Sequence, residues 1–417
     1  MESSRTLGLE VNKVKISQFF TDKIMILAYI FLALAAYGVV EMVYERYFHF
    51  AATTAADAGL FPGDRDVAIA MKEAVFGHGG EVKRESPWSL YIVNYMYMIY
   101  VGSGIIFIVA AAEILEIKDV IQTACGFMTL GLAMVFAGLF TIMMDLNVTS
   151  LQHMLLTPQY TSGMWLMMPL YAVYIPLVIL EIYLILAHKD MWIKKIAFAI
   201  IIVGLLVEFV EFYIQAKLFD MNSARHLWTT YPMLPLYFMV SSFAASLAIM
   251  ILYTYLNSKN LVLIHVLERV ALYLVMALAM FEALAYLNID RKWGEIIMFG
   301  DFKYYFYLYL ILAIIIPFTM LFRERKNKYI KIIASISIIL GTFVGKAVFV
   351  YGGNAYPMSD RFGVGFEKYS EYEEVKEVVF FMPPLSEVAI IIGSIGVILF
   401  VYRVVDLYFS VSNKYKV

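Results

Sequence analysis

Long uninterrupted runs of hydrophobic residues alternate with short polar segments along most of the chain. An α-helix needs about 20 consecutive apolar residues to cross the hydrocarbon core of a bilayer. Ten runs approach or exceed that length, and each predicts a transmembrane helix. These runs are Ile24 to Val40, Trp88 to Ala112, Val120 to Met144, Met164 to Leu186, Trp192 to Ile214, Leu234 to Leu256, Leu261 to Leu287, Tyr304 to Phe322, Tyr329 to Tyr351 and Leu385 to Val405. The pattern therefore predicts an all-α integral membrane protein.

The composition supports this interpretation. Of the 417 residues, 62% are hydrophobic and 16% are charged, whereas soluble domains carry about a quarter charged residues. The net charge of -2 gives no sign of nucleic-acid binding. The single cysteine, Cys125, excludes an internal disulfide, a thiolate zinc site and an iron–sulfur cluster held by this chain.

The positions of the histidines do not fit a haem site. A bis-histidine haem needs two histidines that face each other within the bilayer. Of the six histidines, His265 alone falls clearly within a predicted span. We therefore expect no haem in this chain.

Basic residues in the short loops predict the orientation, because cytoplasmic loops are enriched in Lys and Arg. The segment before the first span, the loop after the fourth (Lys189 to Lys195) and the loop after the eighth (from Arg323) are basic, which places both termini in the cytoplasm. Arg291, Lys292 and Lys303, between spans seven and eight, disagree with this assignment.

In this orientation the three longest loops lie outside the cytoplasm. They are Glu45 to Pro87, Gln215 to Met233 and Gly352 to Pro384. We favour a docking face for a partner protein there, and a self-folded cap is the alternative.

Spans two to five and six to nine form a regular series, each later span starting roughly 140 residues after its counterpart. Four helices per copy preserve direction, so we predict two parallel four-helix bundles with one flanking helix at each end. The predicted divisions are 1–87 (first helix and loop), 88–214 (first bundle), 215–351 (second bundle) and 352–417 (loop and last helix).

Four residues from four predicted helices share a depth near the outer third of the membrane. They are Asn94, Asp145, Trp165 and Glu208. Tyr97 lies one turn from Asn94 on the same helix face. An apolar, aromatic pocket with a few polar groups suits a quinone, whose reduction consumes protons. For the aromatic residues, an interfacial belt or plain packing is the alternative.

Further ionisable residues fall within or beside the spans, where they are costly and often functional. Glu113, Glu181 and Glu211 are candidates for a proton path, and Glu113 has the alternative of closing its helix at the interface. Glu282 and Lys346 are further candidates for a proton path; Lys346 also needs a counter-ion, and Glu282 is the candidate at its depth. His153, in the loop after Asp145, lines the pocket or is simply solvated.

Several segments resemble the NrfD/PsrC-like membrane subunits of the polysulfide reductase family. The resemblance rests on SPWSLYIVNYMYMIYVGSG from Ser86, the MMDL that ends at Leu146, SGMWLMMPLY from Ser162, LPLYFMVSSFAASLA from Leu234 and MPPLSEVAIIIGSIGVILFVYR from Met382. Some relatives carry a histidine in the middle of the second helix, where this chain has Gly102, Ser103 and Gly104.

The resemblance implies a membrane subunit that exchanges electrons with menaquinone or a similar quinone. It implies a ferredoxin-like iron–sulfur partner and a larger catalytic subunit on the extracytoplasmic face of a prokaryotic plasma membrane. It places the quinone in the first bundle, and Asp145 matches the family's motif aspartate, which would exchange protons with the quinone. Asn94, Tyr97 and His153 would position the ring and Trp165 would wall it.

Two other functions stay open at this point. One is a quinone-free structural or proton-conducting relative within a larger complex. The other is a secondary transporter, which parallel repeats and buried acids also fit. A transporter should purify alone, whereas a respiratory subunit should bring an iron–sulfur protein with it.

Overall fold

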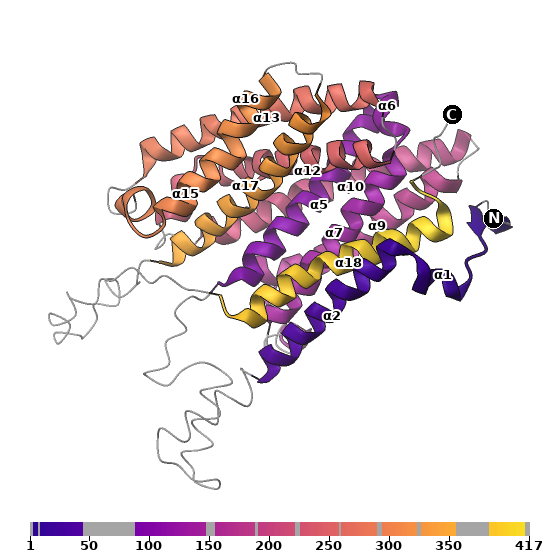
Figure 1. Cartoon of the computed structure of the whole chain (residues 1–417), viewed down its shortest axis with the longest axis horizontal. Coiled ribbons are helices and arrows are strands. Elements are labelled where there is room, and N and C mark those ends of the chain that lie inside the picture. Colours follow the sequence, from indigo (N-terminus) through magenta and orange to yellow (C-terminus); the bar gives the residue numbers. More distant parts are fainter. Residues whose placement is uncertain are drawn as a thin grey trace, which may run out of the picture.

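The computed structural model describes residues 3–6, 9–44, 88–146, 155–187, 191–221, 226–257, 260–289, 294–322, 327–355 and 383–412. Within these residues, ten helices are long and apolar enough to cross a membrane, which confirms the predicted number of spans. They run side by side along the long axis of the molecule (Figure 1).

The bounds of the spans differ from the predicted runs mainly at their ends. The spans are α2 (Lys23–Tyr44), α5 (Leu90–Ile114), α7 (Ala124–Asp145), α9 (Gly163–Ala187), α10 (Met191–Asp220), α12 (Leu234–Leu256), α13 (Leu261–Asn288), a composite of α15 (Lys303–Leu310), η3 (Ile311–Ile315) and α16 (Ile316–Phe322), α17 (Lys328–Asn354) and α18 (Leu385–Phe409). The elements η3 and η2 (Glu295–Phe299) are π-helical.

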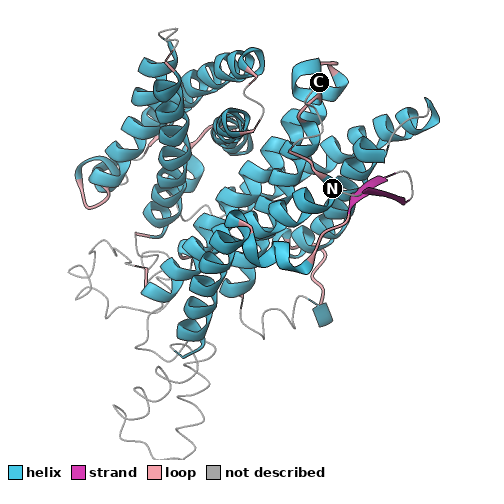
Figure 2. Cartoon of the chain, turned by 45° about the vertical axis from the view of Figure 1, so that its right-hand side comes forward, coloured by secondary structure: helices cyan, strands magenta, loops and turns pink. Residues whose placement is uncertain are grey.

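A few short elements accompany the spans. They are the strands β1 (Ser3–Thr6) and β2 (Leu9–Asn12), and the helices α1 (Ile16–Thr21), α6 (Lys118–Ile121) and α11 (His226–Thr230). The two strands pair antiparallel (Figure 2), and β2 packs against the end of α18, where Asn12 Nδ2 donates to the carbonyl of Leu407 at 3.0 Å. This hairpin was not expected, since the amino-terminal segment is short and polar.

The spans two to nine form two rings of four helices. In the first ring α5, α7, α9 and α10 each pack against the next, and α10 packs back on α5. In the second ring α12, α13, the composite span and α17 do the same. The rings meet where α5 packs against α12 and α17. The helices pack in the same order in both rings, which agrees with the two bundles expected from the regular spacing. The two rings are called the first and second bundle below.

The remaining two spans, α2 and α18, pack against each other and lie side by side outside the first bundle (Figure 1). Glycine permits this contact, because a Cβ on Gly393 would lie 2.5 Å from the backbone nitrogen of Ala35. An ion pair joins the helices where α2 begins, with Arg403 Nη2 donating to Asp22 Oδ2 at 2.7 Å. Both predicted flanking helices therefore form one pair.

The body has two ends, which are named here after α5. At the Leu90 end, Asn354 Nδ2 donates to the carbonyl of Trp88 at 3.0 Å, and the backbone N–H of Leu90 donates to Glu387 Oε2 at 3.3 Å. The opposite end, where α5 finishes, is the Ile114 end. The predicted orientation makes the Leu90 end extracytoplasmic.

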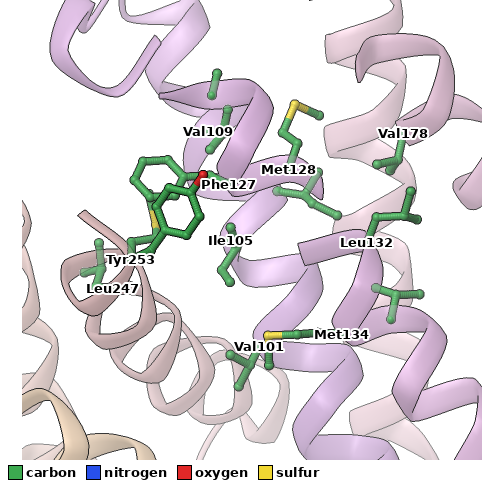
Figure 3. Packing of buried hydrophobic residues seen from close by; sticks show 14 of the residues in the cluster. Val101, Ile105, Val109, Phe127, Met128, Leu132, Met134, Val178, Leu247 and Tyr253 are labelled. Carbon is green, nitrogen blue, oxygen red and sulfur yellow. The ribbon is translucent and has the colours of Figure 1, made fainter. Parts of the chain in front are cut away.

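Close packing of α5 against its neighbours forms the centre of the core. A Cβ on Gly102 would lie 2.6 Å from the carbonyl oxygen of Gly131 on α7, so two backbones meet there without side chains. Around this contact, apolar side chains of α5, α7, α9 and α12 form one buried cluster, and Figure 3 shows Val101 of α5, Leu132 of α7 and Leu247 of α12 among its members. Small residues allow such approach in lipid, where the hydrophobic effect does not drive helices together.

One predicted loop is largely helical. The segment from Gln215 to Met233 was expected outside the membrane, but α10 continues to Asp220 and α11 follows. The reason is that Gln215 and Lys217 are polar and lowered the hydrophobic score, although the buried face of the helix continues through Ala216 and Phe219. The other predicted loops, 45–87 and most of 352–384, lie outside the described residues.

Candidate functional site

Two carboxyl groups are buried at the centre of the first bundle. Glu208 and Glu211 lie one turn apart on α10, and each side chain is 1% exposed. Tyr174 of α9 donates a hydrogen bond to Glu208 Oε1 at 2.6 Å, and Tyr171 donates to Glu211 Oε1 at 3.0 Å. Ser103 of α5 donates to Glu211 Oε2 at 3.2 Å. Three helices therefore supply one hydrogen-bonded group, called the first acid cluster below.

The cluster continues toward the Leu90 end. Gln215, one turn after Glu211, donates to Glu211 Oε1 at 3.3 Å and to the hydroxyl of Tyr171. The hydroxyls of Tyr171 and Tyr95 are 3.4 Å apart. Tyr95 lies five residues into α5, about 8 Å along the helix from Leu90. Polar groups therefore reach close to the Leu90 end.

It also continues toward the Ile114 end. Glu181 of α9 is buried and shares a crevice of about 200 Å³ with Tyr174, Gly204 and Glu208. Glu181 interacts electrostatically with Glu208 and with Glu113, which is half-buried in the last turn of α5. Acidic residues thus follow one another from the Ile114 end to the cluster.

Among the described residues, no Lys or Arg forms an ion pair with Glu208 or Glu211. Burying a carboxylate without a cation is costly unless hydrogen bonds replace water. Tyrosine and serine hydroxyls supply those bonds here. Such an arrangement suits groups that accept and release protons, because the same hydroxyls can donate to a carboxylate or accept from a carboxylic acid.

Glu208 lies nearer the middle of its helix than the sequence predicts. It lies twelve residues, about 18 Å, before the end of the 30-residue helix α10, and its partner Tyr174 lies near the middle of α9. The first acid cluster is therefore central along α9 and α10. The difference from the prediction arises because α10 runs six residues beyond the predicted end at Ile214.

Asn94 and Asp145 lie on another side of α5. Asn94 is fully buried, and its Nδ2 donates to Thr141 Oγ1 of α7 at 3.3 Å and to Ser394 Oγ of α18 at 3.2 Å. Thr141 lies one turn before Asp145. Ser103 lies nine residues after Asn94, two and a half turns along α5, and so on the opposite face. The single pocket expected to join Asn94 and Asp145 with Glu208 is therefore not formed.

The remaining residues expected to contact a quinone are dispersed. Tyr97 donates to the carbonyl of Ile339 at 2.8 Å and its ring contacts Phe343, both on α17 of the second bundle. Trp165 lies near the start of α9, with its ring 4.8 Å from that of Tyr160. His153 lies outside the described residues. Their quinone-binding roles stay predictions.

The second bundle has its own buried carboxyl group near the Leu90 end. Glu282 of α13 accepts hydrogen bonds from Tyr309 at 2.6 Å, Tyr237 at 2.9 Å and Tyr231 at 3.1 Å. These tyrosines come from α15, α12 and the segment after α11. Together with Lys346 they are called the second acid cluster below.

Lys346 of α17 is 3% exposed and interacts electrostatically with Glu282, in agreement with the predicted counter-ion. Its Nζ has no hydrogen-bond partner among the described residues. Instead it lies 3.7 Å from the ring centroid of Phe238 and 5.3 Å from that of Tyr100. Aromatic faces attract a cation and take the place of water.

Sequence reasoning missed most of the residues that hold the carboxyl groups. They are Ser103, Tyr174, Gln215, Tyr231, Tyr237 and Tyr309. The repeat carried a usable signal, because Tyr171 and Tyr309 lie 138 residues apart, close to the offset between the bundles, and each donates to a buried glutamate. Single tyrosines in apolar helices are otherwise indistinguishable from packing residues.

A comparison with known protein families gives a match. The family model described as polysulphide reductase, NrfD, matches residues 77–357, which is more than half of the chain and covers both bundles. No curated protein matches the chain.

Proposed function

Because the chain belongs to the polysulphide reductase NrfD family, whose members are membrane subunits of quinone-linked oxidoreductase complexes, we propose that it exchanges electrons between a menaquinone-like quinone and an iron–sulfur subunit. The iron–sulfur subunit would dock at the Leu90 end and relay electrons to a larger catalytic subunit. This end faces the outside of a prokaryotic plasma membrane, and both termini face the cytoplasm.

One observation carries the proposal. Buried polar side chains follow one another through the first bundle from Glu113 at the Ile114 end, past Glu181 and Glu208, to Tyr95 near the Leu90 end. Ionisable groups at this depth are expensive and are kept where protons or substrates move. A quinone takes up protons together with electrons when it is reduced, so a proton route beside its site matches its chemistry.

Asp145 and Asn94 are the proposed contacts of the quinone ring. They share one side of the first bundle near the Leu90 end, close to the proposed docking face. Asn94 Oδ1 is buried without a hydrogen-bond partner among the described residues, so it is free to accept from a hydroxyl of the reduced ring. Asp145 would exchange a proton with the quinone. Tyr97, Trp165 and His153 would line the rest of the quinone site.

Replacing Asp145 by Asn in the intact complex tests the proposal. It should lower quinol-coupled turnover by about 100-fold or more, because removal of a proton-exchanging group typically costs that much. Assembly with the brown iron–sulfur subunit should be retained. Glu116→Gln, an exposed glutamate at the Ile114 end, is the control and should change neither. Unchanged turnover in D145N, or purification of the chain without any iron–sulfur protein, contradicts the proposal.

A quinone-free, proton-conducting subunit is the second candidate. It is favoured by the hydrogen bonds of Asn94 Nδ2 and of the Tyr97 hydroxyl, which already donate to protein groups rather than to a ligand. The first function is supported if the purified complex retains quinone and a photoreactive quinone labels this chain. The second function is supported if neither quinone nor label is found on it. Membership in the family speaks against a secondary transporter.

A further inference from the structure

A small cavity lies beside Glu282 in the second bundle. It offers about 30 Å³ to water, which is room for about one molecule. Glu282, Tyr231 and Thr230 supply polar groups to its lining, and Tyr286, exposed in the last turn of α13, lines it near the surface. The cavity therefore gives the Glu282 carboxyl group access to water from the Leu90 end.

The groups around Glu282 fit either charge state of this acid. The hydroxyls of Tyr231, Tyr237 and Tyr309 donate to it. A hydroxyl that donates to a carboxylate can accept from a carboxylic acid after protonation. The charged group that faces Glu282 is Lys346, and a nearby cation favours the carboxylate over the acid. The charge of Glu282 therefore depends on how closely Lys346 accompanies it.

Lys346 is not tied to Glu282. Its Nζ is buried and forms no hydrogen bond among the described residues, and no ion pair joins it to Glu282 there. A buried polar group without a partner needs an explanation, and a buried ammonium group is especially costly. The ammonium group sits on a flexible aliphatic stem, so it can change position without a movement of the backbone.

Aromatic rings from both bundles enclose this ammonium group. Lys346 Nζ lies 3.7 Å from the ring centroid of Phe238, 5.5 Å from that of Tyr237 and 5.3 Å from that of Tyr100. Phe238 and Tyr237 belong to α12 of the second bundle, whereas Tyr100 belongs to α5 of the first. The cation therefore lies at the boundary between the bundles, where ring faces attract it from both sides.

Tyr100 connects this boundary to the first acid cluster. Its hydroxyl donates to the carbonyl of Phe212 at 3.3 Å, and Phe212 directly follows Glu211. Tyr100 also interacts electrostatically with Glu211. Ser103, one turn after Tyr100 on α5, donates to Glu211 Oε2 at 3.2 Å. A negative charge on Glu211 therefore acts on the region beside Lys346.

We propose that Glu282 is a second protonation site whose charge is linked to that of Glu211 through Lys346. When Glu211 loses its proton into the first bundle, its carboxylate draws the Lys346 cation away from Glu282. Glu282 then takes up a proton from water at the Leu90 end. When Glu211 is protonated again, the cation returns and Glu282 releases its proton to the same end. The three groups thus titrate as one coupled unit.

The inference rests on the proposed function, in which quinone chemistry changes the charge of the first acid cluster. The link gives the second bundle a part in that chemistry, because each change of charge at Glu211 moves a proton at Glu282.

Infrared difference spectroscopy of the intact complex in lipid nanodiscs tests the protonation site. Spectra in acidic and alkaline buffer differ by the carbonyl stretching band of each carboxyl group that titrates, and the band of a group that water reaches shifts in heavy water. One such band should be absent from Glu282→Gln. Glu41→Gln, a partly exposed acid of α2 outside both bundles, is the control and should retain it. If E282Q loses no band, or the lost band does not shift in heavy water, the proposal is overturned.

Substitution of Glu211 tests the link. In Glu211→Gln the cation stays with Glu282, so the midpoint at which the Glu282 band disappears should move to lower pH by about one unit or more. In a Lys346→Met background the same substitution should leave that midpoint unchanged. A midpoint that Glu211→Gln does not move, or moves equally with and without Lys346, overturns the proposal. Lys346→Gln replaces K346M if that variant does not assemble.

Failure of this inference differs from failure of the proposed function, because quinol turnover is measured on the same preparations. A complex that turns over quinol without the linked titration keeps the proposed function and loses the link. A complex with the linked titration but no quinol turnover keeps the link and loses the proposed function.

Discussion

The two bundles share an order of helices but differ in how they treat buried charge. In the first bundle Glu208 and Glu211 lie near the middle of α10, with hydroxyl partners and no ion-paired cation among the described residues. In the second, Glu282 lies near the Leu90 end with three tyrosine donors, and Lys346 interacts with it electrostatically. The acids of the first bundle follow one another along the helices, whereas the single acid of the second bundle has a cation nearby.

This difference teaches that one helical scaffold supports two kinds of site. A chain of acids whose members neighbour one another is suited to moving protons between the two ends. A single acid with fixed donors and a nearby cation is suited to a change of charge at one place. The repeated tyrosines at Tyr171 and Tyr309 keep the carboxyl groups hydrogen-bonded in both cases.

The largest expected effect separates the two clusters by turnover. Glu208→Gln should lower quinol-coupled turnover of the complex by about 100-fold, because it removes a proton-carrying group from the middle of the route. Glu282→Gln should lower it by at most about tenfold, since the second acid cluster does not cross the membrane. Steady-state quinol turnover of the purified complexes is the measurement. Equal losses would break the distinction between the bundles.

Substitution of one glycine in each bundle compares how tightly the two acid clusters are packed. Gly345→Ala should destabilise the protein by about 1–3 kcal/mol, because the new Cβ would lie 2.5 Å from the Tyr309 ring and push it from Glu282. Gly204→Ala should stay within about 0.5 kcal/mol, since the nearest atom to its Cβ is Glu181 Oε2 at 3.9 Å. Thermal unfolding midpoints in detergent measure both. If Gly204→Ala lowered the free energy of unfolding more than Gly345→Ala does, side chains would be packed more tightly around Gly204 than around Gly345.

The smallest expected effect on stability comes from an ion pair outside both bundles. It serves as a reference for the substitutions within the bundles. Arg403 donates to the Asp22 carboxylate and so holds the pKa of Asp22 below its usual value. The pair therefore stabilises the fold above the usual aspartate pKa, about 3.9, and this stabilisation is lost as the pH falls through the lowered value.

Asp22→Asn should lower the unfolding midpoint slightly at neutral pH, by about 1 kcal/mol or less in stability, because the pair is partly exposed. Wild type and D22N should converge as the pH falls below about 3.9. Melting curves across an acidic pH series measure this. A difference that grows toward low pH would contradict the sign. Turnover at neutral pH should be the same in both proteins.

Much of the fold was predictable because lipid imposes a strong constraint on sequence. A spanning segment must satisfy its backbone within a helix and present apolar side chains, so the ten spans can be read from composition. The candidate site was less predictable. The sequence marked Glu181, Glu208, Glu211, Glu282 and Lys346 as ionisable groups within the spans, and all five are buried. Lys346 interacts electrostatically with Glu282, but no ion pair joins the two among the described residues.

Their partners could not be predicted, because depth along a helix says nothing about the direction of a side chain around its axis. Asn94 was expected to meet Glu208 because of an assigned shared depth, but it faces Thr141 and Ser394 on the other side of α5. Tyr97, one turn along, contacts the second bundle. Rotation about each helix axis is set by contacts between helices, such as that of Gly102 with α7.

The sequence alone determined the number of spans, the repeated order of the two bundles and the presence of acids within the membrane, because each of these follows from hydropathy along one helix at a time. Only the tertiary structure decided which acids share hydroxyls, where α10 ends and where the backbone becomes π-helical. Those features depend on the packing of residues far apart in the chain, which local sequence does not encode.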